Sequence, residues 1–157
     1  MTAISTPDLS GIYHHEQLTD WLGTSGQPKD DQFALIKQAG YQLVVNLALP
    51  SSDHAIPEEG SIVSGLGMAY VHLPVSFESP RVEDLRQFCG VLDAFSSSKI
   101  WVHCVVNARV SVFCYHYLTK RRGLSDSEAR TALLDRWEPE MDDVWRDFLA
   151  IADIEIS

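Results

Sequence analysis

The feature that most constrains the fold of this chain is an apolar strand pattern that leads directly into a cysteine and then into a helix. Residues 99–102 read Lys-Ile-Trp-Val, His103 and Cys104 follow, and an apolar helix pattern begins near Arg109. At such a junction, backbone N–H groups and the helix dipole favour an anion, and the same field favours a thiolate over a thiol. Arginine adds a fork of donors matched to phosphate or sulfate. We therefore interpret this stretch as a nucleophile beside an anion-binding turn.

The rest of the chain alternates strand and helix patterns. We expect strands at residues 18–22, 43–47, 69–73 and 99–102, and helices over residues 28–39, 57–65, 81–95, 109–122, 125–137 and 144–151. The helix after Cys104 is apolar on most faces, so it should be the buried central helix. This order predicts an α/β fold, a three-layer α-β-α sandwich around a mostly parallel sheet of four to five strands.

Length and composition limit the class of protein. We expect 157 residues to form a single domain, with residues 1–10 as a loose leader. The formal net charge of -10 argues against nucleic acid or an anionic membrane as partner. The N-terminus does not resemble a signal peptide, no apolar run has membrane-spanning length, and three cysteines are unlike a disulfide framework. These observations favour a reducing cytoplasm.

The stretch around Cys104 resembles the signature loop of cysteine-dependent phosphatases, the protein tyrosine and dual-specificity superfamily. That loop reads His-Cys, five residues, Arg, then Ser or Thr. Here only four residues separate Cys104 from Arg109, and Ser111 comes one residue late. The loop has no glycine, and Asn107 is its only residue with some tolerance for left-handed backbone.

Further matches resemble a group of small bacterial phosphatase-like proteins over residues 20–150. They are Ser25-Gly26-Gln27-Pro28, Leu73-Pro74-Val75, His103-Cys104, Asn107, Arg109-Val110-Ser111 and Trp137-Glu138-Pro139. The resemblance implies a cysteine phosphatase-like fold and a phosphoric monoester hydrolase that needs no cofactor. It implies a phosphorylated substrate of a class the residues do not specify, and the oligomeric state stays open.

The same resemblance implies a role for each site residue. Cys104 would be the nucleophile that forms a phosphocysteine, and His103 would orient the loop. Ser111 would bond the thiolate, and Glu78 is the only carboxylate available as general acid in residues 76–80. The phosphoryl group would be held by a phosphate-binding loop made of Val105, Val106, Asn107, Ala108 and Arg109.

Each role has a structural alternative. Cys104 could be a buried structural thiol, as we expect for Cys89 and Cys114. Arg109 could pair with a carboxylate, and Ser111 could cap its helix or bond back to a carbonyl. His103 could be a satisfied core histidine, and Glu78 could be a charge favoured by a helix N-terminus.

Two other functions fit the loop. Rhodanese-like sulfurtransferases resemble the pattern Cys, four residues, Arg, and would carry a persulfide on Cys104, although they favour glycine where Asn107 stands. A pseudophosphatase would bind a phosphorylated ligand without turnover. The histidines show no metal-ligand spacing with cysteine or carboxylates, so no metal site is expected.

Overall fold

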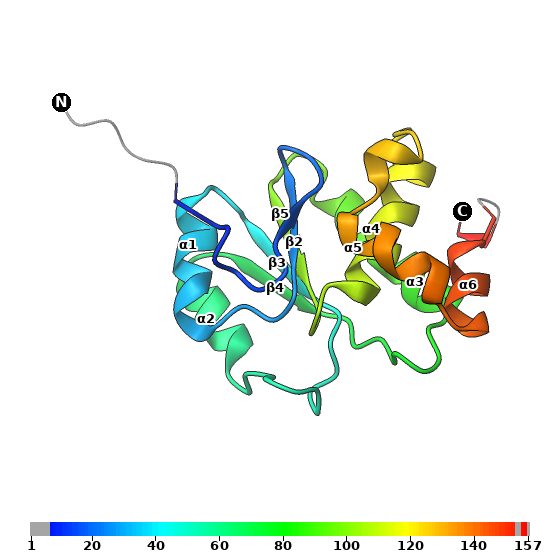
Figure 1. Ribbon diagram of the computed structural model, residues 1–157. Helices are drawn as coiled ribbons and strands as arrows, with labels where there is room; N and C mark the ends of the chain where they lie inside the picture. The colour runs from blue at the N-terminus through cyan, green and yellow to red at the C-terminus, as the bar shows by residue number, and fades with distance from the viewer. Residues whose placement is uncertain (1–6, 153–154, 157) are drawn as a thin grey trace.

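The computed structural model describes residues 7–152, 155 and 156, and it contains a five-stranded sheet (Figure 1). The strand order is β1-β2-β5-β3-β4, in which β1 is antiparallel to β2 and the other neighbours are parallel. The strands are β1 (Glu16–Gln17), β2 (Leu22–Ser25), β3 (Leu43–Asn46), β4 (Ala69–His72) and β5 (Ile100–His103). This confirms the mostly parallel sheet. Residues 1–6 of the expected leader lie outside the described residues.

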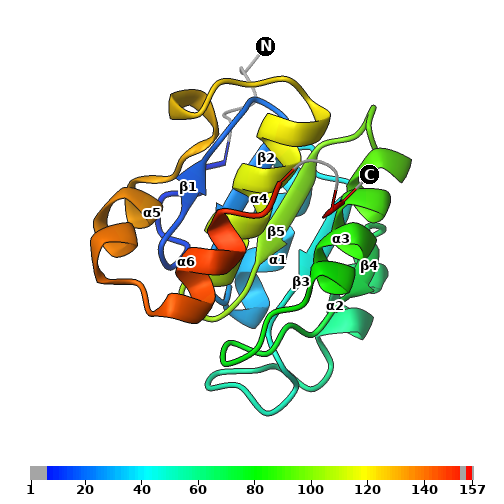
Figure 2. The ribbon, with the colours of Figure 1, turned by 90° about the vertical axis from the view of Figure 1, so that its right-hand side faces the viewer.

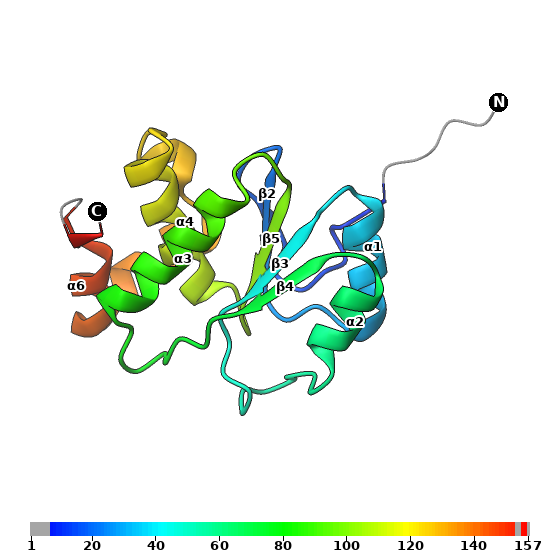
Figure 3. The ribbon, with the colours of Figure 1, turned by 180° about the vertical axis from the view of Figure 1, so that it is seen from behind.

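Helices cover both faces of the sheet, so the three-layer α/β architecture is confirmed. On one face lie α1 (Phe33–Gln38) and α2 (Glu59–Gly65). Figure 3, in which the molecule is seen from behind, shows both helices on this face. On the other face, turned toward the viewer in Figure 2, lie α3 (Val82–Ala94), α4 (Ala108–Arg121), α5 (Ala132–Trp137) and α6 (Asp143–Leu149). Three short 3-10 helices, η1 (Asp30–Gln32), η2 (Ser127–Ala129) and η3 (Glu138–Glu140), complete the described elements.

The central strands β2, β3 and β5 are buried and supply two apolar cores. Val44 and Trp101 belong to the smaller core, with side chains of α1 and α2. Val45 and Val102 belong to the larger core, with side chains of α3, α4, α5 and α6. Ten of the 14 residues of α4 are buried, which confirms it as the buried central helix. No helix in the described part of the chain is long and apolar enough to cross a membrane.

The expected strand at residues 18–22 is wrong. Residues 18–21 form a turn in which Thr19 Oγ1 accepts hydrogen bonds from the N–H groups of Trp21 and Leu22, and β2 begins only at Leu22. β2 contains the small residues Gly23, Thr24 and Ser25, which look like a loop in the sequence. At Gly23 a larger residue would not fit. A Cβ added to Gly23 would lie 2.5 Å from the Trp101 ring.

The single helix expected over residues 125–137 is also wrong. The predicted capping contacts between Ser125 and Glu128 are present, but the helix they begin is only η2. Arg130 is extended, with ψ 134°, and Thr131 begins α5 by accepting a hydrogen bond from the N–H of Leu134 at 3.0 Å. A second N-cap thus interrupts the predicted helix.

Candidate active site

The candidate site lies at the carboxyl ends of the parallel strands. Loops that follow β2, β3, β4 and β5 gather at this edge, the lower edge of the sheet in Figure 1. In open α/β sheets this edge is where ligands bind. The loop after β5 runs from Cys104 to Asn107 and enters α4 at Ala108.

The four carbonyl groups of this loop are each held by a hydrogen-bond donor. The bonds join His103 Nδ1 to Cys104 O at 3.2 Å, Gln27 N–H to Val105 O at 3.0 Å, His14 Nδ1 to Val106 O at 2.8 Å, and Ser111 N–H to Asn107 O at 3.1 Å. A trans peptide points its C=O and its N–H in opposite directions, and no cis peptide occurs in the described chain. Because each of the four carbonyl groups points toward its donor, the N–H group of the next residue points in the opposite direction.

The N–H groups of this loop are the candidate anion-binding element. Among the described residues, the N–H groups of residues 105–110 donate to no acceptor. The first N–H groups of a helix lack intrahelical partners and carry the positive end of the dipole. Six consecutive donors beside a cysteine make a cradle suited to an oxyanion.

Asn107 shapes the turn into α4. Its φ of 76° is left-handed, in agreement with the tolerance for left-handed backbone that the sequence indicates for this residue. Its side-chain Nδ2 donates to His14 O at 2.9 Å and to Thr24 Oγ1 at 3.1 Å. Asn107 thus ties the loop to β2 and to the segment before β1.

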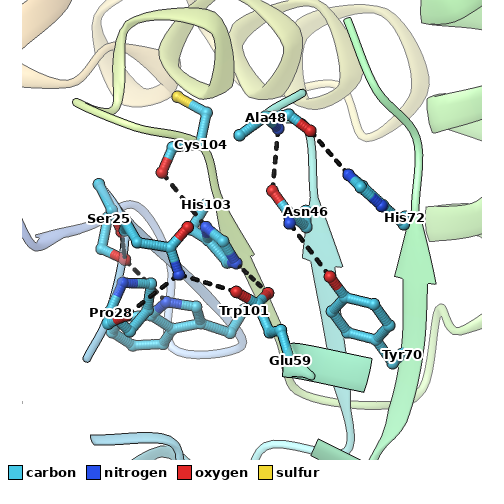
Figure 4. Close-up of polar contacts among 12 residues, drawn as sticks. Ser25, Pro28, Asn46, Ala48, Glu59, Tyr70, His72, Trp101, His103 and Cys104 are labelled. Carbon is cyan, nitrogen blue, oxygen red and sulfur yellow. Dashed lines mark hydrogen bonds and ion pairs between the residues drawn. The ribbon is translucent and has the colours of Figure 1, made fainter. Parts of the chain in front are cut away.

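The three cysteines are free thiols, and all are buried. Cys104 has no exposed surface, and Figure 4 shows its sulfur directed away from Glu59. Burial raises the pKa of Cys89 to about 11 and raises the pKa of Cys114 well above its ordinary value. Cys89 and Cys114 therefore fit the structural role expected of them.

Arg109 reaches toward the loop after β4. Its Nη1 donates to Val75 O at 2.8 Å, and its guanidinium lies 5.9 Å from the centre of the Phe77 ring. Within the described part of the chain it forms no ion pair, so the alternative of a carboxylate partner is not found. Because guanidinium has five N–H donors, this arrangement leaves donors for an anion.

Ser111 does not make the expected bond to the thiolate. Its hydroxyl donates to Asn107 O at 2.7 Å and lies 2.7 Å from Thr131 Oγ1. A hydroxyl has one proton, and here that proton goes to a carbonyl of the preceding turn. The structure therefore agrees with the alternative in which Ser111 stabilises the start of α4.

Glu78 lies on the exposed loop that follows β4. Its side chain forms no hydrogen bond or ion pair with any described residue, so its role as acid stays a prediction. The loop itself is anchored next to it. Trp145 Nε1 donates to Phe77 O at 2.7 Å, and the Phe77 ring packs against Trp137 and Trp145.

Glu59 is a further candidate residue of the site that the sequence does not indicate. This residue of α2 is 2% exposed and receives hydrogen bonds from His103 Nε2 at 2.6 Å (Figure 4) and from Gln27 Nε2 at 2.7 Å. Burial raises the pKa of Glu59, but the hydrogen bond and charge of His103 and the bond of Gln27 outweigh burial and hold that pKa below its usual value. In the sequence Glu59 looks like an ordinary acidic residue in a first helical turn.

A cavity of about 690 Å³ lies beside the loop. Val105 and Val106 form its wall on the loop side, and other elements contribute Tyr13, Gln27, Lys29 and His54. Its volume lies within the range of small-molecule sites. Among the described residues, no group of three histidines, cysteines or carboxylates is placed to hold a metal ion.

The chain has the fold of the cysteine-dependent phosphatases. No protein-family model and no curated protein matches the chain. A solved structure of a candidate phosphatase of the DUF442 family, from Shewanella putrefaciens CN-32, is 35% identical to it with a TM-score of 0.82. The match covers 90% of this chain and 92% of that one. The chain belongs to the DUF442 family.

More distant structures share the fold. Tk-PTP in its active form matches with a TM-score of 0.68 and 20% identity, over 87% of this chain and 93% of that one. TpbA of P. aeruginosa also has a TM-score of 0.68, with 16% identity over 90% of this chain and 87% of that one. Both matches support the expected cysteine phosphatase fold.

Proposed function

We propose that this protein is a cysteine-dependent phosphoric monoester hydrolase. The observation that carries the proposal is the cradle of N–H groups of residues 105–110 next to the thiol of Cys104. Donors arranged before the reaction stabilise the charge that develops on the phosphoryl oxygens, because they need no reorganisation. Arg109, within the same turn, supplies further donors.

The reaction has two steps. The Cys104 thiolate attacks phosphorus, so that an S–P bond forms, the P–O bond to the leaving group breaks, and Glu78 protonates the leaving oxygen. Water then attacks the phosphocysteine and gives a proton to the Glu78 carboxylate, the S–P bond breaks, and inorganic phosphate leaves as the thiolate is restored. The cavity walled by Val105 and Val106 receives the organic part of the substrate.

Access to the thiol requires movement, because Cys104 has no exposed surface. The Arg109 side chain is the group suited to move, because the loop after β4 that it contacts through Val75 O is anchored by Trp145. Releasing this contact would free the guanidinium for a phosphorylated substrate.

Hydrolysis of p-nitrophenyl phosphate and of phosphotyrosine tests the proposal. We expect turnover that Cys104→Ser abolishes and that Cys89→Ser leaves within about twofold, with Arg109→Lys lowering kcat/KM by at least about 100-fold. Acid quenching during turnover should trap a phosphate on the peptide that contains Cys104. Turnover unchanged in Cys104→Ser would refute the mechanism.

Two further outcomes identify the other functions. Transfer of sulfur from thiosulfate to cyanide, with a persulfide on Cys104, would establish the sulfurtransferase instead. Phosphate binding that requires Arg109, without turnover of any phosphomonoester, would establish a pseudophosphatase.

A further inference from the structure

Glu59 is a buried carboxylate that the proposed mechanism does not use. It comes from α2, on the opposite side of the sheet from α4, and it meets His103 at the end of β5. One carboxylate oxygen accepts from His103 Nε2 (Figure 4) and the other from Gln27 Nε2. A buried charge is costly unless it is paired and hydrogen-bonded, and here both oxygens have partners.

The hydrogen bonds of His103 join Glu59 to the loop. Nε2 lies 2.6 Å from a carboxylate oxygen of Glu59, and Nδ1 lies 3.2 Å from Cys104 O. His103 has no exposed surface, so these two contacts set the orientation of its ring.

Two of the four bonds that hold the loop carbonyls lead back to this carboxylate. His103 holds Cys104 O directly, and the backbone of Gln27 holds Val105 O while the side chain of Gln27 bonds Glu59. Since peptides are planar, fixing these two carbonyls fixes the direction of the next two N–H groups, those of Val105 and Val106.

We infer that Glu59 is a positioning residue of the anion-binding loop, which holds His103 and Gln27 so that the N–H groups of Val105 and Val106 face an oxyanion bound beside Cys104. The effect of Glu59 on turnover rests on the proposed function. The effect of Glu59 on the binding of inorganic phosphate is independent of catalysis.

Glu59→Gln tests this role, with Asp84→Asn as matched control. Asp84 is also a buried carboxylate in the first turn of a helix, but its partner is Arg81, the N-cap residue of α3. The readout is the concentration of inorganic phosphate that protects Cys104 from iodoacetamide, followed on the Cys104 peptide by mass spectrometry. We expect Glu59→Gln to weaken phosphate binding about tenfold, as loss of a hydrogen bond to a charged group would, and Asp84→Asn to leave it unchanged.

The pH profile of alkylation separates positioning from charge alone. If Glu59 positions the N–H donors, its replacement by Gln moves the half-maximal alkylation rate of Cys104 to higher pH, because fewer donors face the thiolate. If Glu59 acted only as a nearby negative charge, its removal would move the profile to lower pH. A downward shift or an unchanged profile overturns the inference.

Glu59→Asp keeps the test decisive where Glu59→Gln does not fold. This variant retains the charge but is one methylene shorter, so it cannot reach both His103 and Gln27 at their present distances. Positioning predicts weaker phosphate binding in Glu59→Asp, and wild-type affinity in this variant refutes it.

The outcomes separate this inference from the proposed function. If the Glu59 variants bind phosphate more weakly as expected but the wild type shows no turnover, only the proposed function is refuted. If the wild type shows turnover but the Glu59 variants bind phosphate with unaltered affinity, only this inference is refuted.

Discussion

Asn107 combines a backbone role with a side-chain role in the loop. A left-handed φ costs an ordinary residue about 1 kcal/mol more than glycine, and the side-chain amide of Asn107 adds bonds to His14 O and Thr24 Oγ1. The tolerance of asparagine for left-handed backbone made Asn107 recognisable from the sequence. Glu59 was not recognisable, because its partner His103 lies 44 residues away and only the sheet brings them together.

The two roles of Asn107 can be separated by two substitutions. Asn107→Gly removes only the side-chain bonds, whereas Asn107→Ala also imposes left-handed strain. We expect both variants to lower the free energy of unfolding, with Asn107→Ala losing about 1 kcal/mol more than Asn107→Gly. Urea unfolding measures the difference, and equal losses in the two variants would contradict the strain.

At the scale of the element, the sequence predicted best where a strand or helix carries its own signal. β3, β4, β5, α2, α3 and α4 fall where apolar runs or helical spacing indicate them. β2 carries no such signal, because Leu-Gly-Thr-Ser looks like a turn and becomes a strand through its fit against Trp101. The break before α5 depends on the side chain of Thr131, which lies against Ser111 of α4.

Two glycines test this contrast between local signal and tertiary fit. A Cβ on Gly23 of β2 would lie 2.5 Å from Trp101 and 2.9 Å from Tyr41 Oη, whereas a Cβ on Gly90 of α3 meets nothing within 4 Å. We expect Gly23→Ala to destabilise the protein by about 1–3 kcal/mol through overpacking. Gly90→Ala should stabilise it by about 0.5–1 kcal/mol through helix propensity. Chemical unfolding of both variants is the measurement, and a neutral Gly23→Ala would show that β2 has room to adjust.

For the whole molecule, the depressed pKa of Glu59 links stability to pH. The folded protein holds this carboxyl group ionised below its ordinary value of 4.5, so it binds fewer protons than the unfolded chain there. Its contribution to stability is therefore present above about pH 4.5 and is lost as the pH falls through the folded value. We expect urea midpoints of the wild type to decline more steeply below this pH than those of Glu59→Gln, and parallel declines would contradict the linkage.

The net charge of -10 acts over a longer range than the cradle does. Hydrogen bonds from a cradle of N–H groups would act on an anion only over a few ångströms, whereas the net negative charge repels an anion from farther away. Raising the ionic strength from about 0.01 to about 0.1 M shortens the Debye length from about 30 to about 10 Å, which screens the surface but not contacts within the loop. Alkylation of Cys104 by iodoacetate, an anion, should therefore accelerate relative to alkylation by neutral iodoacetamide. The ratio of the two rates cancels any salt effect on loop opening. A ratio that falls with salt would mean that a positive field extends well beyond the loop, and that this acidic chain attracts anions from a distance.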